Sequence, residues 1–369
     1  MSKPTAIDLF CGAGGLTAGL ERAGFRIAGA LDSWQRAVES YRKNFPHPIV
    51  AANISLLGPE DFLRSIQWTG DAIDLVAGGP PCQGFSVQRI GPYQDQRNDL
   101  ILEFARFVLG LRPRVYLMEN VPGLLGKRGR ETAKRFELAL RQGGYTVSFA
   151  RVNAADYGVP QLRRRVFFYG WRVGERPFAF PGSAVAPPLH RTVWSAIGDL
   201  PSPPSDYTPS PRDPLHRRTR LAPQNVERLK LIPPGGGFTH LPESMRVDCH
   251  KNGPEKIGHR YVYGRLAPDE PSGTITARFD SFTRGKFAHP YEDRNITLRE
   301  GARLQTFADD HAFCGSQEEI AALIGNAVPP LLAAMIGRGL YGHLTGERPV
   351  HDEAREQKEL ELFAAATQP

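Results

Sequence analysis

Cysteine is scarce in this chain and never clustered. Four occur among 369 residues, at Cys11, Cys82, Cys249 and Cys314. None forms a Cys-x-x-Cys pair, and none lies near histidine at the spacing of zinc ligands. This scarcity argues against a disulfide framework and against a metal site. We therefore expect a reducing, cytoplasmic setting and no bound metal.

Long apolar runs are missing as well. Hydrophobic residues make up 41% of the chain and charged residues 23%, which is an ordinary globular composition. No run approaches the length of a membrane span, so we expect no membrane contact. The N-terminus enters a strand-like segment almost at once, which leaves no room for a signal peptide. The length suits one large domain and one smaller domain.

Acidic residues are the minority among the charged ones. There are 39 against 46 lysines and arginines, for a formal net charge of +7. Such a balance mildly favours a polyanionic partner. The arginines gather in the second half of the chain, at Arg163–Arg165, Arg217, Arg218, Arg220, Arg228, Arg260 and Arg265. Scattered arginines also suit a plain solvated surface, so the motifs must decide between the two.

The first ~170 residues alternate between strand-like and helix-like segments. This alternation predicts an α/β fold with a doubly wound, mostly parallel sheet and helices on both faces. Strands are expected at 5–10, 26–31, 71–77, 114–118, 145–152 and 166–171, and helices at 16–23, 35–44, 98–109 and 131–142.

The character of the chain changes after Trp171. Prolines are dense between residues 177 and 234, and long helices cannot pass through them. We expect a smaller, irregular domain there, with helix returning at 298–305 and 329–339. The predicted organisation is a catalytic and cofactor-binding domain at 1–174, a second domain at 175–290, a return segment at 291–345 that completes the first domain, and a charged tail at 346–369.

One cysteine stands out by its setting. Residues 74–86 read Asp-Leu-Val-Ala-Gly-Gly-Pro-Pro-Cys-Gln-Gly-Phe-Ser, an apolar strand that stops at two glycines. Pro80 and Pro81 then stiffen the backbone before Cys82. A thiol at the carboxyl end of a parallel strand sits where open α/β sheets place their chemistry. A cysteine that merely ends a strand is the other interpretation.

The first predicted strand runs into a glycine-rich loop. Gly12, Gly14 and Gly15 allow a tight turn and close approach to a ligand. Thr17 replaces the third glycine of the dinucleotide pattern, and no basic residue is present to meet a pyrophosphate. Asp32 follows the second strand, 20 positions after Gly12, which suits the ribose hydroxyls of an adenosine cofactor. These features favour an adenosine without phosphates, such as S-adenosylmethionine, over NAD.

Two further groups carry charge to the ends of strands. Glu119 closes the strand at 114–118, on the edge of the sheet where Cys82 emerges. A carboxyl close to a thiol would raise the pKa of that thiol, so Glu119 is expected to serve a substrate instead. Strand alternation puts Arg163 and Arg165 on one face, where two guanidiniums suit a phosphate or a base carbonyl. A helix-capping glutamate and a solvated strand edge are the plainer alternatives.

Together these motifs resemble the DNA cytosine-5 methyltransferases of bacterial restriction–modification systems. The matching segments, in the order of the family, are 8–15 (Asp-Leu-Phe-x-Gly-x-Gly-Gly), 79–86 (Gly-Pro-Pro-Cys-Gln-Gly-Phe-Ser), 119–121 (Glu-Asn-Val), 161–165 (Gln-x-Arg-x-Arg), 299–305 (Arg-Glu-x-x-Arg-Leu-Gln) and 325–328 (Gly-Asn-Ala-Val). They cover most of the chain outside 175–290. Three positions depart from the family: Asp32 replaces a common glutamate, Ser33 replaces a bulky residue, and Asn53-Ile54 stands where an aspartate often contacts the adenine.

The resemblance implies a role for each matching residue. Cys82 would be the nucleophile and Glu119 the acid that engages the base, with Arg163 and Arg165 near the target nucleotide. Residues 175–290 would be the target-recognition domain. The cofactor, S-adenosylmethionine, would be lined by Phe10, Gly12, Gly14, Asp32, Asn53, Ile54 and Asn326. DNA would be contacted by Gln83, Ser86, Arg228 and Arg260.

The implied reaction is methylation of C5 in a cytosine flipped out of a short, specific duplex DNA site. The partners implied are double-stranded DNA and a cognate restriction endonuclease, for a monomer in the bacterial cytoplasm at the nucleoid. A tRNA cytosine-5 methyltransferase shares the motifs, although the proline- and arginine-rich insertion has the size that base readout in DNA needs. A NAD-dependent oxidoreductase on a similar sheet is the alternative of another class, and the missing third glycine argues against it.

Overall fold

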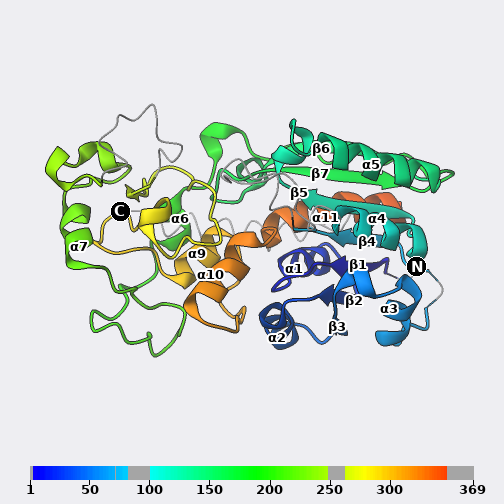
Figure 1. The fold of residues 1–369 in the computed structure, drawn as a ribbon, viewed down its shortest axis with the longest axis horizontal. Coiled ribbons are helices and arrows are strands. Elements are labelled where there is room, and N and C mark those ends of the chain that lie inside the picture. The colour runs from blue at the N-terminus through cyan, green and yellow to red at the C-terminus, as the bar shows by residue number, and fades with distance from the viewer. Residues whose placement is uncertain (1–2, 71, 82–99, 248–261, 347–369) are drawn as a thin grey trace.

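A mostly parallel, seven-stranded sheet forms the centre of the larger lobe (Figure 1). The computed structural model describes residues 3–70, 72–81, 100–247 and 262–346. The strand order is β3-β2-β1-β4-β5-β7-β6, and only β7 runs against its neighbours in this part of the chain. The strands are β1 (Thr5–Leu9), β2 (Arg26–Asp32), β3 (Ile49–Ala51), β4 (Leu75–Gly78), β5 (Val115–Asn120), β6 (Ser148–Asn153) and β7 (Arg164–Trp171). The predicted α/β fold with a doubly wound sheet is confirmed.

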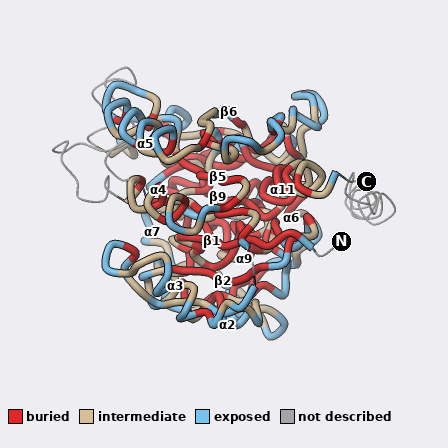
Figure 2. The backbone as a smooth tube through the Cα atoms, turned by 90° about the vertical axis from the view of Figure 1, so that its right-hand side faces the viewer, coloured by how far each residue is buried: buried red, intermediate tan, exposed pale blue. Residues whose placement is uncertain are grey.

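Helices cover both faces of this sheet, and the alternation of side chains along each strand explains why. On β1, Ile7 and Leu9 join one apolar cluster, whereas Ala6 joins the cluster of the opposite face. The first face carries α3 (Pro59–Ser65), α4 (Leu100–Leu111) and α5 (Arg130–Gln142), and the second carries α1 (Gly15–Arg22) and α11 (Pro330–Thr345). Helix α2 (Gln35–Asn44) lies beside β2 and β3. Figure 2 shows the buried strands between the more exposed helices.

Parallel pairing brings three loops to one edge of the sheet. Leu9 of β1 lies opposite Gly78 of β4, and Gly78 lies opposite Met118 of β5. The glycine-rich loop, the Pro80–Pro81 turn and the end of β5 therefore follow side by side. Gly78 itself is required by close packing, because a Cβ there would lie 2.3 Å from the carbonyl oxygen of Leu9.

The smaller lobe consists of short elements, as the dense prolines predict (Figure 1). Its described helices and strands are α6 (Val193–Ile197), α7 (Pro223–Lys230), β8 (Gly264–Arg265), β9 (Lys286–Ala288), α9 (Leu298–Leu304) and α10 (Gln317–Asn326). Across both lobes, single 3₁₀ turns occur at Ile54–Leu56, Pro122–Leu125, Ala154–Tyr157, Pro187–Leu189, Phe238–His240, Glu243–Met245 and Phe282–Arg284. Helices α9 and α10 share an apolar cluster with α6, and α11 returns to pack on α1.

The expectation that no run approaches the length of a membrane span is wrong for the stretch Gln317–Thr345, which is long and apolar enough to span a membrane by composition alone. Its most apolar window is 72% buried inside the protein. Leu332, Ile336 and Leu340 of α11 pack into the cluster between α1 and the sheet. The hydrophobicity of this stretch is therefore accounted for by its place in the core.

Candidate active site

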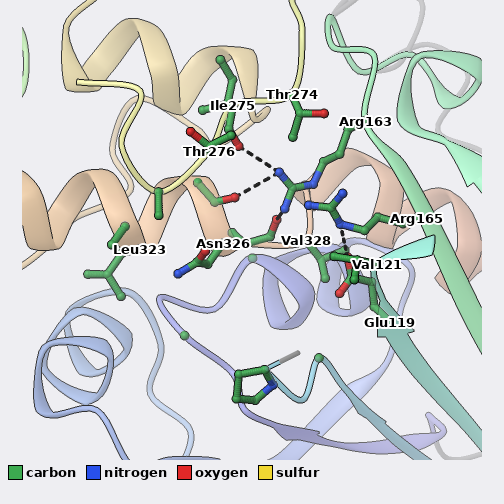
Figure 3. Close-up of a pocket in the computed structure, with 18 of the residues that line it drawn as sticks. Glu119, Val121, Arg163, Arg165, Thr274, Ile275, Thr276, Leu323, Asn326 and Val328 are labelled. Carbon is green, nitrogen blue, oxygen red and sulfur yellow. Dashed lines mark hydrogen bonds and ion pairs between the residues drawn. The ribbon is translucent and has the colours of Figure 1, made fainter. Parts of the chain in front are cut away.

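A deep cleft of about 2330 Å³ opens between the carboxyl edge of the sheet and the smaller lobe. Segments from both lobes line it: the glycine-rich loop and residues 31–34, 52–55, 79–81, 119–123, 162–165, 270–277, 284–287, 322–323 and 325–328. Figure 3 shows Arg165 and Glu119 turned toward each other, with Thr274 and Asn326 on other segments that line the cleft. The fold thus assembles in one space residues that are up to 320 positions apart in the sequence.

The glycine-rich loop forms one end of the cleft. Phe10, Gly12 and Gly14 all have positive φ, at 60°, 56° and 89°, a region that glycine adopts without strain. Gly14 is also required by packing, since a Cβ there would lie 2.2 Å from the ring of Phe45.

Asp32 braces the loop, since its Oδ2 accepts a 2.8 Å hydrogen bond from the Gly12 amide and its Oδ1 accepts one from Trp34. Burial raises the pKa of Asp32. A Cβ on Gly12 would meet nothing within 4 Å, so this glycine faces open space.

The other residues predicted for the cofactor lie at the same end. Phe10, Asn53, Ile54 and Asn326 all line the cleft. The Oδ1 atom of Asn53 accepts a 3.0 Å hydrogen bond from the Ser55 amide and so caps a 3₁₀ turn. Six of the seven residues predicted to bind the cofactor therefore line the cleft. Gly14 does not, because its Cα faces the ring of Phe45.

Asp8 is a site residue that the sequence reasoning missed. It is fully buried, and its Oδ2 accepts hydrogen bonds from the Thr17 amide and hydroxyl, at 3.1 and 2.7 Å. Its Oδ1 is buried and has no protein partner. Burial raises the pKa of Asp8 to about 7. The sequence held a signal for Asp8, which is an acid inside an otherwise apolar strand. Thr17, which stands where the dinucleotide pattern has its third glycine, binds this acid through its hydroxyl.

Cys11, on the same loop, is unsuited to nucleophilic chemistry. Burial, reinforced by the neighbouring Asp8 and Asp32, raises the pKa of its thiol well above the ordinary value. A thiol held in its protonated form is inert at neutral pH. Cys82 itself, with Gln83 and Ser86, lies outside the described residues.

The turn that leads to Cys82 is tied to the strand that carries Glu119. Asn120 donates a 3.1 Å hydrogen bond from Nδ2 to the Pro80 carbonyl oxygen, and its Oδ1 accepts one of 2.9 Å from the Val121 amide. Asn120 is 2% exposed. The Pro80–Pro81 turn therefore has a fixed position beside Glu119 at the cleft.

Glu119 and Arg165 form an ion pair at the centre of the cleft. The distance from Arg165 Nε to Glu119 Oε1 is 2.8 Å, and both side chains are largely buried (Figure 3). Antiparallel pairing of β5 with β7 makes them diagonal neighbours on one face of the sheet, because Glu119 lies opposite Phe167, two residues from Arg165. Gly79 lies against the other carboxylate oxygen, which a Cβ there would meet at 3.4 Å. This pair was not predicted from the sequence, because Glu119 was assigned to the substrate and Arg165 to a phosphate or a base carbonyl.

The structure corrects the expectation that Arg163 contacts the target nucleotide. Arg163 lies beside Arg165 as the alternation predicts, but it is 1% exposed and binds the protein's own backbone. Its guanidinium donates to the carbonyl oxygens of Ile275, Gly325 and Ala327, at 3.0, 3.0 and 2.9 Å. Burial, and secondarily the charge of Arg165, lowers the pKa of Arg163. Arg163 therefore joins the start of β7 to the segments around Ile275 and around 325–327, and its guanidinium is not free to contact a nucleotide.

Replacing Arg163 should therefore cost stability. Arg163→Ala leaves three carbonyl groups without their donors and opens a cavity, so the free energy of unfolding should fall by about 3 kcal/mol or more. Urea denaturation measures this change. Arg164→Ala is the matched control, because Arg164 is exposed and should change stability by less than about 0.5 kcal/mol. An equal loss of unfolding free energy in the two variants would contradict this structural role of Arg163.

Arg228 also differs from its predicted role in contacting DNA. It is 7% exposed, and it donates 2.8 Å hydrogen bonds to the Met245 carbonyl oxygen and to Asn225 Oδ1. Its guanidinium also lies 5.6 Å from the ring centre of Tyr263. These partners engage Arg228 inside the smaller lobe. Arg260 lies outside the described residues.

Cations that the sequence analysis did not assign to DNA line the cleft, whereas Arg228 does not. Arg284 is exposed and Lys286 is half-buried on the side of the smaller lobe, and Arg164 is exposed on the side of the sheet. No local pattern marked Arg284 or Lys286, so the sequence reasoning passed over both.

The fold and the cleft define a class of protein. A doubly wound sheet with a glycine-rich loop after β1, a bracing acid after β2 and a carboxyl–arginine pair at the end of β5 is the arrangement of an enzyme that uses an adenosine cofactor at the carboxyl edge of its strands.

Comparisons with known proteins narrow this class. The family model for C-5 cytosine-specific DNA methylases matches residues 5–341. The chain is 35% identical to the Type II methyltransferase M1.HphI of Haemophilus parahaemolyticus, over 93% of this chain and 88% of that protein. It is 33% identical to the Type II methyltransferase M.NgoFVII of Neisseria gonorrhoeae, over 97% and 93%.

A solved structure agrees with these relatives. A protein named as a DNA modification methyltransferase of an E. coli prophage superposes with a TM-score of 0.69 at 29% identity, over 93% of this chain and 99% of its own. The chain belongs to the C-5 cytosine-specific DNA methylase family, and it is a DNA cytosine-5 methyltransferase.

Proposed function

We propose that this enzyme methylates C5 of a flipped cytosine within a short duplex site, through a covalent bond between Cys82 and C6 of the base. The supporting observation is the Glu119–Arg165 pair, held at 2.8 Å beside the Pro80–Pro81 turn in the cleft that also holds the glycine-rich loop. An acid, the approach to a thiol and a cofactor loop therefore share one space.

The residues at the cofactor end fit S-adenosylmethionine, which supplies an electrophilic methyl group. The unpartnered Oδ1 of Asp8 is a buried acceptor that suits an ammonium donor. Asp32 suits the ribose hydroxyls, and the open space at Gly12 lets a ligand approach the backbone. Phe10, Asn53, Ile54 and Asn326 complete the wall, and Gly14 is proposed to shape the loop behind it.

The chemistry requires a soft nucleophile and an acid on opposite parts of the ring. C5 of cytosine is a poor nucleophile until the Cys82 thiolate adds to C6, which breaks the conjugation and makes C5 enamine-like. Glu119 shares a proton with N3 and so stabilises the charge that develops on addition. Once C5 has taken up the methyl group, a base removes the C5 proton, the C6–S bond breaks and Cys82 leaves as thiolate.

Arg165 has a defined part in these steps. Its ion pair with Glu119 fixes the carboxyl in the cleft, which spares the cost of organising it when the base enters. The target base must leave the helix, because its neighbours in the stack cover both faces of the ring. Gln83 and Ser86, next to the nucleophile, are proposed to contact the DNA at the vacated position.

Duplex DNA is favoured over tRNA as the substrate. The supporting observation is that the relatives at 31–35% identity are named Type II methylases or methyltransferases. Labelled methyl transfer to a mixed duplex library and to tRNA tests the choice. Incorporation into the duplex alone is expected, and incorporation into tRNA alone would refute the proposal.

Residues 175–290 are proposed as the target-recognition domain, and a cognate restriction endonuclease is proposed as the functional counterpart. The setting proposed is a monomer in the bacterial cytoplasm, at the nucleoid. Arg284, Lys286 and Arg164 are proposed to contact phosphates from the two sides of the cleft, because a cation on an otherwise open wall attracts the DNA backbone.

Loss of one phosphate contact should be visible in the salt dependence. Lys286→Ala should weaken binding to every duplex sequence alike and reduce the slope of log K against log salt by about 1. Fluorescence anisotropy over a salt series measures both. Lys230→Ala is the control, because Lys230 lies on α7 and pairs with Glu227 at 2.8 Å. An unchanged slope for Lys286→Ala would remove this residue from the interface.

Removal of the acid after β2 should affect the cofactor. Asp32→Ala removes the proposed ribose acceptor and also the brace on the Gly12 amide, so S-adenosylmethionine should bind more weakly by on the order of 1.5–3 kcal/mol. Titration calorimetry measures the affinity directly. Unchanged affinity would count against both roles of Asp32.

A further inference from the structure

The glycine-rich loop is held from outside by a histidine that no step of the reaction uses. His311 lies in the segment between α9 and α10, 298 positions from the loop, and is 8% exposed. Its Nε2 is 2.9 Å from the Ala13 carbonyl oxygen. A carbonyl oxygen only accepts, so His311 is the donor and carries its proton on Nε2. Burial lowers the pKa of His311 to about 4, so the ring is neutral at pH 7.

The bond acts on the most deformable peptide of the loop. Ala13 stands between two glycines with positive φ, so little in the backbone itself resists rotation of the Ala13–Gly14 peptide. The Gly14 amide donates to the Cys11 carbonyl oxygen at 2.9 Å, and His311 binds the oxygen of the same peptide. Both ends of this peptide plane are therefore held, one from inside the loop and one from His311.

His311 is rigidly mounted. The Ala312 amide and carbonyl each form a 2.8 Å hydrogen bond with the Asn44 side chain of α2, and the Cys314 amide donates to Ser40 Oγ at 2.9 Å. The imidazole packs against the rings of Phe307 and Phe313, with centroids 4.7 and 4.9 Å away. A donor fixed in this way loses little entropy when it holds the loop.

We propose that His311 is a positioning residue for the methyl donor: its Nε2–H fixes the Ala13–Gly14 peptide and so preorganises the glycine-rich loop for the cofactor. The proposal rests on the cofactor site proposed above. His311 touches neither the substrate nor the Glu119–Arg165 pair, so it acts on cofactor affinity and leaves the chemical step unchanged.

Two substitutions separate hydrogen bonding from packing. His311→Phe keeps an aromatic ring and removes the donor, whereas His311→Gln removes the ring and places an amide nitrogen near the position of Nε2. We expect the Phe variant to bind S-adenosylhomocysteine about fivefold more weakly, the usual size for one lost hydrogen bond, and the Gln variant to bind close to wild type. Both variants should keep kcat at saturating cofactor, with the loss confined to the KM for the cofactor.

Isothermal titration of the purified full-length protein with S-adenosylhomocysteine is the test. His343→Phe is the control, because His343 is on α11, away from the glycine-rich loop. Wild-type affinity in the Phe variant together with weak binding in the Gln variant would show that only packing matters and would overturn the proposal. Where the Phe variant does not fold, His311→Asn replaces it, because its shorter amide cannot reach Ala13, and equal affinities of the Asn and Gln variants would likewise overturn it. Failure of the wild type to bind would instead refute the cofactor site itself.

Discussion

Cys82→Ser abolishes methyl transfer while folding and DNA binding remain close to wild type. Serine keeps the size and most of the shape of the side chain, but its hydroxyl is not ionised near pH 7 and is a poor partner for C6. The Pro80–Pro81 turn that leads to position 82 is held by Asn120, so the exchange does not remove a structural contact of that turn. Transfer of a tritiated methyl group to duplex DNA measures the loss.

The other cysteines supply the controls. Cys314→Ser is the matched change, since Cys314 is partly buried and does not line the cleft, and it should leave activity unaltered. Circular dichroism and anisotropy with duplex DNA show whether the Cys82→Ser protein is folded and still binds. Appreciable turnover by a folded Cys82→Ser protein would contradict covalent catalysis.

Glu119→Gln slows methyl transfer by ~100-fold or more, a size typical of lost general-acid assistance. Glutamine occupies the same volume but cannot share a proton with N3, and it also loses the charge that pairs with Arg165 across 2.8 Å. Cofactor affinity should change little, because Glu119 is at the centre of the cleft and not at the glycine-rich loop. Single-turnover rates with saturating cofactor and DNA measure the chemical step.

A remote exchange of the same kind checks the specificity of this effect. Glu137→Gln, on the outer surface of α5, breaks only an ion pair with Arg141 and should leave the rate within about twofold, since exposed pairs contribute little. A Glu119→Gln enzyme that transfers methyl groups at the wild-type rate but binds the cofactor weakly would show that Glu119 belongs to the cofactor site instead.

The large lobe could be predicted well from the sequence because its strands and helices have clear periods. The predicted helix at 35–44 matches α2, and the helix at 131–142 starts one residue after α5 does. The elements that were missed include β3, α3 and, in the smaller lobe, α10. Strand β3 has three residues, too few to show alternation, and α3 opens on a proline and two acids. The capping box of Ser316 and Glu319 at the start of α10 was an available signal.

Some residues of the site could be predicted from the sequence and others could not. The glycine-rich loop and Glu119 could be placed because the carboxyl ends of parallel strands share an edge. The fate of Arg163 could not, because a sequence shows charge and not burial, and the partners of Arg163 are 112 to 164 residues away. Arg284 and Lys286 became visible only when the fold brought the cleft walls together, whereas Asp8, an acid inside an apolar strand, had a signal in the sequence that was not used.

The central claim is the covalent bond between Cys82 and the target base, and a mechanism-based trap tests it most directly. A duplex carrying 5-fluorocytosine at the target is incubated with enzyme and S-adenosylmethionine, because fluorine at C5 cannot leave as a proton does. Covalent catalysis by Cys82 predicts a denaturation-resistant complex whose tryptic peptide carries the methylated, fluorinated base on Cys82, as read by mass spectrometry. The absence of such a complex with a duplex that the enzyme methylates, or a base attached to any other residue, would contradict the account.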